Sequence, residues 1–264
     1  MTTLILPGVG GSEPAHWQTW LEGELDDSVR IEQADWHSPV LHTWRLNLDR
    51  ALLNATEPVW IVAHSFGCLV TMSALSSRVL ASKVAGVLLV APASPERFTL
   101  EGFARDIKQP TAEGQAHPPA LLSRVLPRAP LGLPIRLIAS RTDPWLSFEV
   151  AEWWATRWGA KLIDLGDAGH INVAAGFGAW PQVLVELSTL KYSSGAVQQF
   201  SLRQRSAVDA VITANTAVSA ERADTTAASS TQTIPTQTQA SVQGEVEHLE
   251  QHHDALNQFT KQVV

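Results

Sequence analysis

The sequence predicts a three-layer α/β fold, in which a mostly parallel β-sheet carries helices on both faces. Two observations carry this prediction. Short apolar runs alternate with helix-like segments along residues 1–194, and strands that are joined through helices run parallel. All ten tryptophans also precede residue 194, so the hydrophobic core is expected in that part of the chain.

Each expected element follows from a local pattern. Apolar runs bounded by turn residues predict strands, here near residues 3–7, 29–33, 58–63, 84–91, 135–140 and 161–165. Segments with apolar residues at helical spacing predict helices, here near residues 15–25, 39–54, 67–80, 147–158 and 179–190.

The third strand leads into the most informative motif of the chain. The apolar run 59–62 is followed by Ala-His-Ser-Phe-Gly-Cys at residues 63–68. A strand that ends in small-x-Ser-x-Gly and opens into a helix is the nucleophile elbow of α/β-hydrolases, where a strained turn exposes the serine hydroxyl. Ala63 replaces the usual first glycine and is still small. Ser65 is therefore the predicted nucleophile, although Ser-x-Gly also occurs in ordinary loops.

A serine nucleophile needs a base that takes its proton and an acid that orients this base. In α/β-hydrolases these residues follow in the order serine, acid, histidine. Asp143 follows the fifth apolar run, and His170 lies in a glycine-bracketed loop after the sixth. Both are thus predicted at the carboxyl ends of strands, where parallel sheets bind ligands. Each also fits an ordinary turn, and Asp164 and Asp167 are rivals for the acid because they lie nearer to His170.

The glycine-rich loop after the first strand predicts an oxyanion hole. Residues 7–12 are Pro-Gly-Val-Gly-Gly-Ser, and such a loop lets backbone N–H groups approach a developing negative charge. The expected donors are Phe66, which follows the nucleophile, and Val9 in this loop, with Gly8 and Gly10 as alternatives. A phosphate-binding loop is disfavoured, because the loop lacks both Gly-x-Gly-x-x-Gly and Gly-Lys-Ser/Thr.

Residues from about 1 to 190 resemble the retinoblastoma-binding-protein-9-like family of small serine hydrolases. The matching motifs are spread over the whole segment and comprise Pro7-Gly8 with Gly11-Ser12, His16-Trp17-Gln18 with Trp20, Asp35-Trp36 with Pro39 and Trp44, His64-Ser65-Phe66-Gly67-Cys68, Ser140 with Asp143-Pro144, and Gly169-His170-Ile171-Asn172 with Gly176-Phe177-Gly178 and Trp180-Pro181. The resemblance implies a compact α/β-hydrolase with a Ser65, Asp143, His170 triad and esterase-type activity on small carboxylic esters. The chain departs from such proteins in its C-terminal extension, because they end near the position of Leu190.

Composition disfavours several other classes of protein. A net charge of −7 disfavours nucleic acid and anionic membrane surfaces as partners. No apolar run approaches the roughly 18 residues of a membrane span, and the N-terminus lacks the pattern of a signal peptide. The single cysteine, Cys68, excludes an intramolecular disulfide, which fits a cytoplasmic protein, and it is expected to be a buried small hydrophobe. No metal ion or cofactor is expected.

Residues 95–133 interrupt the alternation of strands and helices with repeated prolines. This stretch is expected to form a cap over the substrate pocket, and a long surface crossover is the alternative. Three tryptophans that follow strand ends or the glycine-rich loop, Trp17, Trp36 and Trp145, are candidates for the pocket wall. Their alternative is a place in the core.

Three other histidines lie near the predicted site. His16 and His37 are within reach of the pocket, but exposed positions on the surface are expected for both. His64 directly precedes the nucleophile, and its side chain is expected to point away from the reaction. It is therefore not assigned as the base.

The chain changes character near residue 194. Only two of the sixteen glycines and one of the fifteen prolines lie beyond it, and residues 224–241 are almost all Thr, Ala, Ser and Gln, which predicts a flexible linker between weak helical patterns. His248 and His252 have metal-ligand spacing, but a solvated helix face is preferred because no third ligand is in view. The predicted domains are a hydrolase domain over 1–194 and a partly disordered, partly helical extension over 195–264.

Two functional hypotheses follow. The first is a serine hydrolase that cleaves small carboxylic esters through an acyl-enzyme intermediate. The second is a catalytically idle hydrolase fold that binds proteins, with the extension as the interaction module and a partner that the sequence does not identify. The complete set of serine, acid and histidine favours the first, because a pure binding protein has no reason to keep the three in register.

Overall fold

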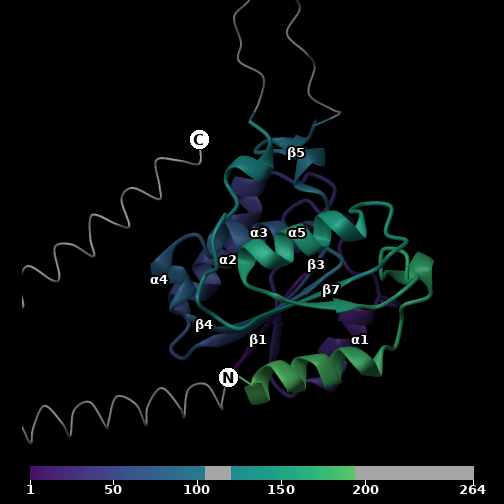
Figure 1. The fold of residues 1–264 in the computed structure, drawn as a ribbon. Coiled ribbons are helices and arrows are strands. Elements are labelled where there is room, and N and C mark those ends of the chain that lie inside the picture. The colour runs from purple at the N-terminus through teal and green to yellow at the C-terminus, as the bar shows by residue number, and fades with distance from the viewer. Residues whose placement is uncertain (105–119, 194–264) are drawn as a thin grey trace, which may run out of the picture. The chain divides into compact units, whose positions relative to one another are not determined.

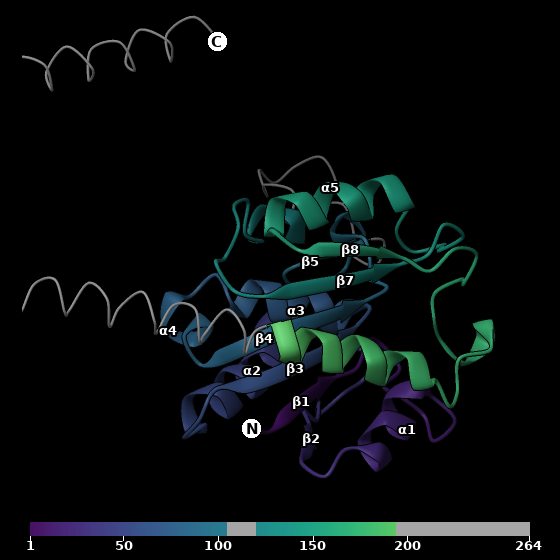
Figure 2. The ribbon, with the colours of Figure 1, turned by 60° about the horizontal axis from the view of Figure 1, so that its bottom comes forward.

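The structure, a computed structural model, describes residues 1–104 and 120–193. Its centre is a six-stranded sheet with the strand order β2-β1-β3-β4-β7-β8, in which every neighbouring pair is parallel (Figure 1 and Figure 2). The predicted three-layer α/β fold is confirmed. The predicted extension, with its linker and its histidine pair, lies outside the described residues.

The strands of this sheet agree closely with the sequence-based prediction. Their bounds are β1 (Thr3–Leu6), β2 (Ser28–Arg30), β3 (Val59–His64), β4 (Val84–Val90), β7 (Ile135–Ala139) and β8 (Lys161–Asp164). The central strands β3, β4 and β7 are buried along their whole length, as expected for a parallel sheet that is covered on both faces. The short strand β2 lies at an edge and is only partly buried.

The helices are α1 (Trp17–Glu24), α2 (Leu41–Asn54), α3 (Phe66–Ala74), α4 (Arg78–Ala81) and α5 (Phe148–Trp158). A further helix covers residues 181–193. The single helix predicted over 67–80 is wrong, because α3 ends before Leu75 and α4 begins after Ser77. Leu75, Ser76 and Ser77 separate them, and the backbone of Ser77 is extended. Serine competes with the helical backbone for hydrogen bonds and favours such helix ends.

The helices divide between the two faces of the sheet. Helices α2, α3 and α5 lie on one face, and α1 and the helix over 181–193 lie on the opposite face (Figure 2). The side chains of each group form a separate buried cluster. Side chains alternate between the faces along each strand. In β3, Ile61 and Ala63 join the first cluster, whereas Trp60 and Val62 join the second.

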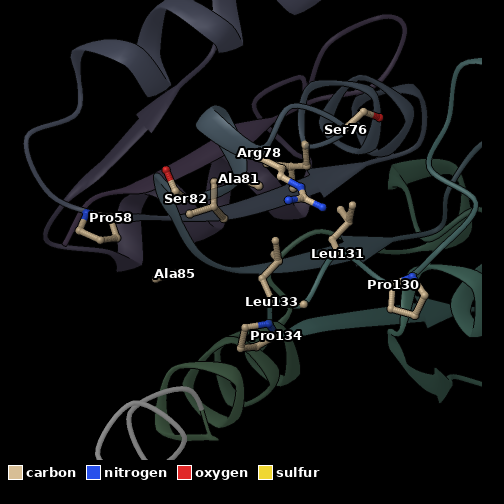
Figure 3. A pocket seen from close by; sticks show the side chains of 13 residues that line it. Pro58, Ser76, Arg78, Ala81, Ser82, Ala85, Pro130, Leu131, Leu133 and Pro134 are labelled. Atoms are coloured by element: carbon tan, nitrogen blue, oxygen red, sulfur yellow. The ribbon is translucent and has the colours of Figure 1, made fainter. Parts of the chain in front are cut away.

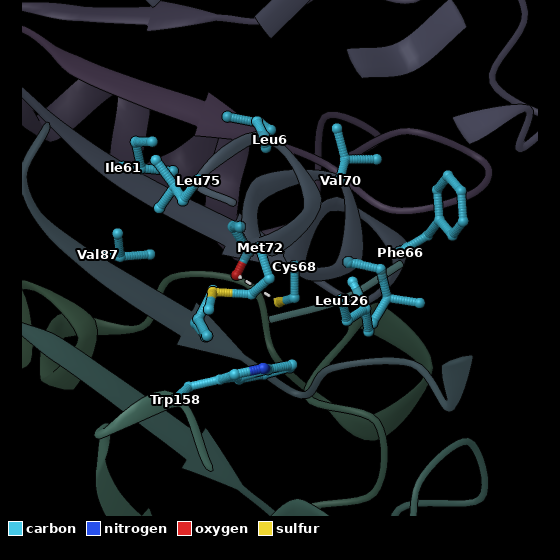
Figure 4. Close-up of a cluster of buried hydrophobic side chains, with 14 of the residues drawn as sticks. Leu6, Ile61, Phe66, Cys68, Val70, Met72, Leu75, Val87, Leu126 and Trp158 are labelled. Carbon is cyan, nitrogen blue, oxygen red and sulfur yellow. Dashed lines mark hydrogen bonds between the residues drawn. The ribbon is translucent and has the colours of Figure 1, made fainter. Parts of the chain in front are cut away.

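Helix α3 is the most buried helix, because all nine of its residues are buried. Figure 4 shows Cys68 and Met72 of this helix within the first cluster, with Val87 of β4 and Trp158 of α5 nearby. The Cys68 thiol donates weakly to the carbonyl of Ala63 at 3.4 Å. The prediction that Cys68 is a buried small side chain is confirmed. The residue that precedes α3 is therefore held on a rigid support.

Part of the proline-rich stretch 95–133 is described. It contains the small hairpin of β5 (Phe98–Thr99) and β6 (Gly102–Phe103), and short 3₁₀ turns at Pro95–Arg97 and Leu122–Arg124. The buried Phe98 ring packs on Phe66 with a centroid distance of 4.7 Å. The start of this stretch thus covers the N-terminus of α3, whereas residues 105–119 lie outside the described residues. No helix within the described residues is long and apolar enough to cross a membrane.

Candidate active site

The serine turn between β3 and α3 is strained. Ser65 has φ 53° and ψ −121°, a conformation that costs a non-glycine residue about 1–3 kcal/mol. Close packing maintains it. A Cβ atom on Gly67 would lie 2.5 Å from the carbonyl oxygen of Leu6, and one on Gly8 would lie 2.6 Å from the Cβ of Ser65. Small residues are therefore required around the serine.

Three side chains from three loops meet at the carboxyl edge of the sheet. The Oγ atom of Ser65 lies 2.9 Å from Nε2 of His170, and Nδ1 of His170 lies 2.9 Å from each carboxylate oxygen of Asp143. Because a carboxylate can only accept, Nδ1 carries the proton and Nε2 is free to accept one from the serine. This geometry can activate a hydroxyl nucleophile.

Two hydroxyl groups tie the loop of the acid to the loop of the histidine. Ser140 Oγ accepts the N–H of Ala168 at 2.9 Å, and Thr142 Oγ1 accepts the N–H of Gly169 at 3.1 Å. These bonds fix the spacing between the two loops. Sequence reasoning gave neither hydroxyl a role, although a Ser-x-Thr directly after a strand is a signal for loop hydrogen bonds.

The rival carboxylates face other partners. Asp164 pairs with the guanidinium of Arg141 at 2.5 Å, and this hydrogen bond lowers the pKa of Asp164. Asp167 is exposed. The hydrogen bond of His170 Nδ1 goes to Asp143, so the geometry favours Asp143 as the acid.

The glycine-rich loop leaves few candidates for the oxyanion hole. The N–H of Gly10 donates to the carbonyl of Trp36 at 2.8 Å. It is therefore not free to stabilise an oxyanion, and Gly10 is no longer an alternative to Val9. Val9 lines the cavity beside Ser65, whereas Gly8 is absent from that lining. Phe66 is the first residue of α3, and N–H groups at a helix N-terminus favour negative charge. Val9 and Phe66 are therefore the best-placed pair.

The cavity at this site is small, with a volume of about 250 Å³. Its wall includes Val9, Ser65, His170, Glu13, Phe98 and Asn172. Phe98 belongs to the stretch that was predicted to cap the pocket. A larger cavity of about 690 Å³ lies elsewhere, between the segments that precede β4 and β7 (Figure 3). Its wall holds Arg78 and several prolines but no Ser–His–Asp arrangement.

Comparisons with known proteins identify the family of the chain. The family model described as serine hydrolase matches residues 3–189. The chain belongs to the serine hydrolase family. A Bacillus subtilis (strain 168) protein, YdeN, which is described as a hydrolase, is 25% identical over 190 residues, covering 68% of this chain and 90% of YdeN.

Solved structures extend the comparison of this serine hydrolase. The crystal structure of a YdeN-like protein from Pectobacterium atrosepticum, described as a hydrolase, has 33% sequence identity and a TM-score of 0.61, and covers 73% of this chain and 91% of that protein. The structure of the ydeN gene product of B. subtilis has 20% identity and a TM-score of 0.52, and covers 72% and 98% of the two chains. The second likeness shows a shared fold.

One of the three candidate tryptophans lines the cavity of this serine hydrolase. The ring of Trp145 lies 5.8 Å from that of His170 and forms part of the wall. Trp17 is fully buried, and Trp36 packs edge-on against Trp44 at 5.4 Å. Neither belongs to the lining, so the structure places these two in packing positions, which was the alternative.

Two histidines differ from the expectation. His16 is 2% exposed and lines the cavity, so its predicted place on the surface is wrong, whereas His37 is exposed. The ring of His64 packs 5.0 Å from that of His170 instead of pointing away. Its Nε2–H donates to the carbonyl of His170 at 3.0 Å. His64 is therefore not the base, but it supports the loop that carries His170.

A pair of ring N–H groups holds the strained turn at His170. Besides the bond from His64, Trp17 Nε1–H donates to the carbonyl of Ile171 at 2.8 Å, and Ile171 has φ 48°. Trp17→Phe removes this N–H and keeps an aromatic ring. We expect kcat to fall roughly 10-fold with little change in KM, because a small displacement of His170 slows the reaction without changing the cavity wall.

The control for Trp17→Phe is Trp20→Phe in the same helix. It is expected to leave kcat within twofold of the parent value. Steady-state kinetics on one ester measures both variants. A Trp17→Phe protein with unchanged kcat would show that the hydrogen bond to Ile171 does not position the histidine.

The buried histidines predict acid sensitivity of the fold. Burial lowers the pKa of His16 from 6.5 to about 4, and burial together with the charge of His170 lowers the pKa of His64 well below 6.5. Below pH 6.5 these two histidines bind protons in the unfolded chain but remain neutral in the folded protein. The free energy of unfolding therefore falls as the pH drops from 6.5 towards 4. His16 alone contributes a loss of about 2 kcal/mol at pH 5.

Urea unfolding at pH 7.5 and pH 5.0 tests this expectation. The drop in the free energy of unfolding between the two pH values should be about 2 kcal/mol smaller in His16→Asn than in the parent. His37→Asn, at an exposed histidine, is the matched control. An equal drop in His16→Asn and the parent would contradict the assignment to His16.

Within residues 1–104 and 120–193, no group of three or more His, Cys, Asp or Glu side chains could hold a metal ion.

Proposed function

We propose that this serine hydrolase cleaves small carboxylic esters through an acyl-enzyme intermediate. One observation carries the proposal, namely the continuous set of 2.9 Å contacts from Ser65 Oγ through the His170 ring to the Asp143 carboxylate. In this proposal Ser65 is the nucleophile, His170 the general base and acid, and Asp143 the residue that orients the imidazole.

The proposed reaction has two halves. Ser65 Oγ attacks the ester carbonyl while His170 Nε2 takes its proton, and the N–H groups of Phe66 and Val9 stabilise the oxyanion. The tetrahedral intermediate collapses when His170 returns the proton to the leaving alcohol. A water molecule, deprotonated by His170, then attacks the acyl-enzyme. His170 returns that proton to Ser65 Oγ as the tetrahedral intermediate collapses, which releases the acid and free Ser65.

The cavity wall supports a preference for small, uncharged substrates. A volume of about 250 Å³ is below the range of pockets that hold drug-sized ligands. Glu13 also lines this cavity, and its negative charge, which acts on His16, disfavours a second negative charge nearby. Short-chain esters without an ionised carboxylate are therefore the proposed substrate class.

Two narrower assignments belong to this proposal. The motifs around Ser65, Asp143 and His170 support a place near the retinoblastoma-binding-protein-9-like members of the serine hydrolase family. A cytoplasmic location is proposed because a chain with the single cysteine Cys68 cannot form an intramolecular disulfide.

A fluorophosphonate probe tests the nucleophile directly. The full-length protein is expected to be labelled at Ser65, as read by mass spectrometry of the labelled peptide, and to hydrolyse p-nitrophenyl acetate and butyrate faster than longer esters. A protein that is folded, unlabelled and inactive on all esters would favour the idle, protein-binding hydrolase fold instead.

We propose that residues 1–194 form the hydrolase domain and that residues 195–264 are an appendage. Within residues 1–104 and 120–193, buried hydrophobic side chains run from Leu4 to Leu190, and each proposed site residue precedes residue 195. A protein of residues 1–194 is therefore expected to fold and to keep kcat/KM within a few-fold of the full chain. Limited proteolysis of the full chain should cut first within 224–241. A truncated protein that precipitates, or changes its ester preference, would show that the extension supports the domain or covers Ser65.

A further inference from the structure

We propose that His16 is a substrate-recognition residue, whose Nε2–H donates a hydrogen bond to a neutral acceptor group of the ester. The inference rests on the proposed function, because it takes the cavity at Ser65 as the place where the ester binds. It extends that function by naming a chemical feature of the substrate, which is an uncharged oxygen close to the scissile bond.

His16 is held rigidly at the start of α1. It is the N-cap residue of this helix, and its Nδ1 accepts the backbone N–H of Gln18 at 3.1 Å. The side chain of Gln18 is itself fixed, because Ser12 Oγ donates to its Oε1 at 2.7 Å and its Nε2 donates to the carbonyl of Leu6 at 3.2 Å. The imidazole of His16 is thus pre-positioned beside the cavity.

The helix cap decides which nitrogen carries the proton. Nδ1 accepts a hydrogen bond, so it is unprotonated, and in a neutral imidazole the proton then resides on Nε2. Burial keeps the ring neutral at pH 7 by lowering the pKa of His16 to about 4. The folded protein therefore presents His16 as a hydrogen-bond donor with no positive charge.

This donor has no partner within the described residues. The one hydrogen bond of the His16 side chain is the cap at Nδ1, and its other close contacts are ring contacts with Trp17 and His64. His16 is 2% exposed and lines the cavity at Ser65. Nε2 of His16 is not among the sealed side-chain polar atoms that lack a partner in the described residues, so this N–H opens to the cavity, and a substrate that supplies an acceptor can bind it there.

The surroundings select a neutral acceptor over a carboxylate. The ring of His64 lies 5.1 Å from that of His16 and is also kept neutral by burial, which holds the pKa of His64 well below 6.5. Glu13 adds a negative charge to the same cavity wall. An ether, hydroxyl or carbonyl oxygen can accept from His16 without repulsion from Glu13.

The test compares esters that differ by one oxygen. On the acyl side, p-nitrophenyl methoxyacetate is paired with p-nitrophenyl butyrate. On the alcohol side, 2-methoxyethyl acetate is paired with butyl acetate. In each pair an ether oxygen replaces a methylene group at nearly constant shape. The ratio of kcat/KM within each pair is measured for the parent and for His16→Asn, so that differences in intrinsic ester reactivity cancel.

His16→Asn is the informative variant because asparagine is a preferred N-cap residue but is too short to place a donor where Nε2 lies. In one of the two pairs we expect the preference for the ether ester to fall about 3- to 10-fold, the range of one hydrogen bond. In that pair, kcat/KM should fall more for the ether ester than for its methylene partner. His16→Ser, which also caps helices well, replaces His16→Asn if that variant does not fold.

A second measurement examines the tautomer in the unaltered protein. The ¹⁵N chemical shifts of the His16 ring at pH 7 should report a protonated Nε2 and an unprotonated Nδ1. Unchanged ether preferences in both pairs, an equal loss on all four esters, or a protonated Nδ1 would each overturn the proposal. These results differ from failure of the proposed function, which would appear as full activity in Ser65→Ala or as no hydrolysis by the parent.

Discussion

Ser65→Ala is expected to abolish ester hydrolysis while leaving the protein folded. Removal of the nucleophile of a Ser–His–Asp triad lowers kcat by roughly a million-fold. The alanine fits the same turn, because it keeps the Cβ atom that packs against Gly8 and loses an oxygen whose partner is His170 Nε2. Hydrolysis of p-nitrophenyl butyrate measures the loss of activity, fluorophosphonate labelling measures the loss of the nucleophile, and thermal unfolding checks that the protein is folded.

The matched control for Ser65→Ala is Ser73→Ala. Ser73 is also buried and belongs to α3, but it lies two turns beyond the nucleophile position. Its replacement should leave both labelling and kcat close to the parent values. Ester hydrolysis at near the parent rate in Ser65→Ala, with the protein folded, would transfer the nucleophile to another residue.

Asp143→Asn is expected to lower kcat roughly 10⁴-fold, as the same change does in other triads. Both oxygens of Asp143 lie 2.9 Å from Nδ1 of His170. In the proposed mechanism, the carboxylate holds the proton on Nδ1 and stabilises the imidazolium that would form when Nε2 takes the proton of Ser65. An amide lacks the charge and can turn an N–H group towards the ring, which selects the wrong tautomer.

The rival carboxylates are the controls for Asp143→Asn. Asp167→Asn changes an exposed residue, and Asp164→Asn breaks a surface ion pair with Arg141. Neither should change kcat by more than a few-fold, since exposed ion pairs contribute little. An inactive Asp167→Asn protein, together with an active Asp143→Asn protein, would assign the role of orienting acid to Asp167. Steady-state kinetics at pH 7.5 on one ester compares all three.

The strands and the serine turn could be predicted from sequence because their causes are local. A buried parallel strand needs a short apolar run, and the six runs gave bounds within about three residues of those observed. The elbow needs small residues, and Gly67 is required by the 2.5 Å approach to a backbone oxygen. Such steric demands are written into the sequence at the position where they act.

Local sequence patterns gave the wrong structure where side chains or backbone groups could form alternative hydrogen bonds or packing contacts. The segment 67–80 has an apolar pattern that suits one helix, yet Ser76 and Ser77 end α3 and start α4. Trp17 and Trp36 were candidates for the pocket wall because they follow the glycine-rich loop or a strand end. In the structure, Trp17 is buried and its Nε1–H donates to the carbonyl of Ile171. Periodicity does not show which of two burial sites a large ring will occupy.

The histidines show most clearly what needs the tertiary structure. From sequence alone, His16 and His64 are polar residues near a reactive serine, and their exposure, tautomer and charge are open. The structure decides all three through contacts with residues distant in the chain. His64 meets the carbonyl of His170 across a separation of 106 residues, and His16 shares one cavity with Ser65, His64 and His170.

By itself, the sequence determined the fold class, the order of the six parallel strands along the chain and the candidates Ser65, Asp143 and His170, because apolar periodicity and backbone sterics act over a few residues. Only the tertiary structure decided that Gly10 is occupied as a donor, that Asp143 rather than Asp164 or Asp167 meets the histidine ring, and that His16 is buried in the cavity wall. Hydrogen bonds and desolvation depend on which groups meet in space, and loops far apart in sequence meet at one sheet edge only after the chain has folded.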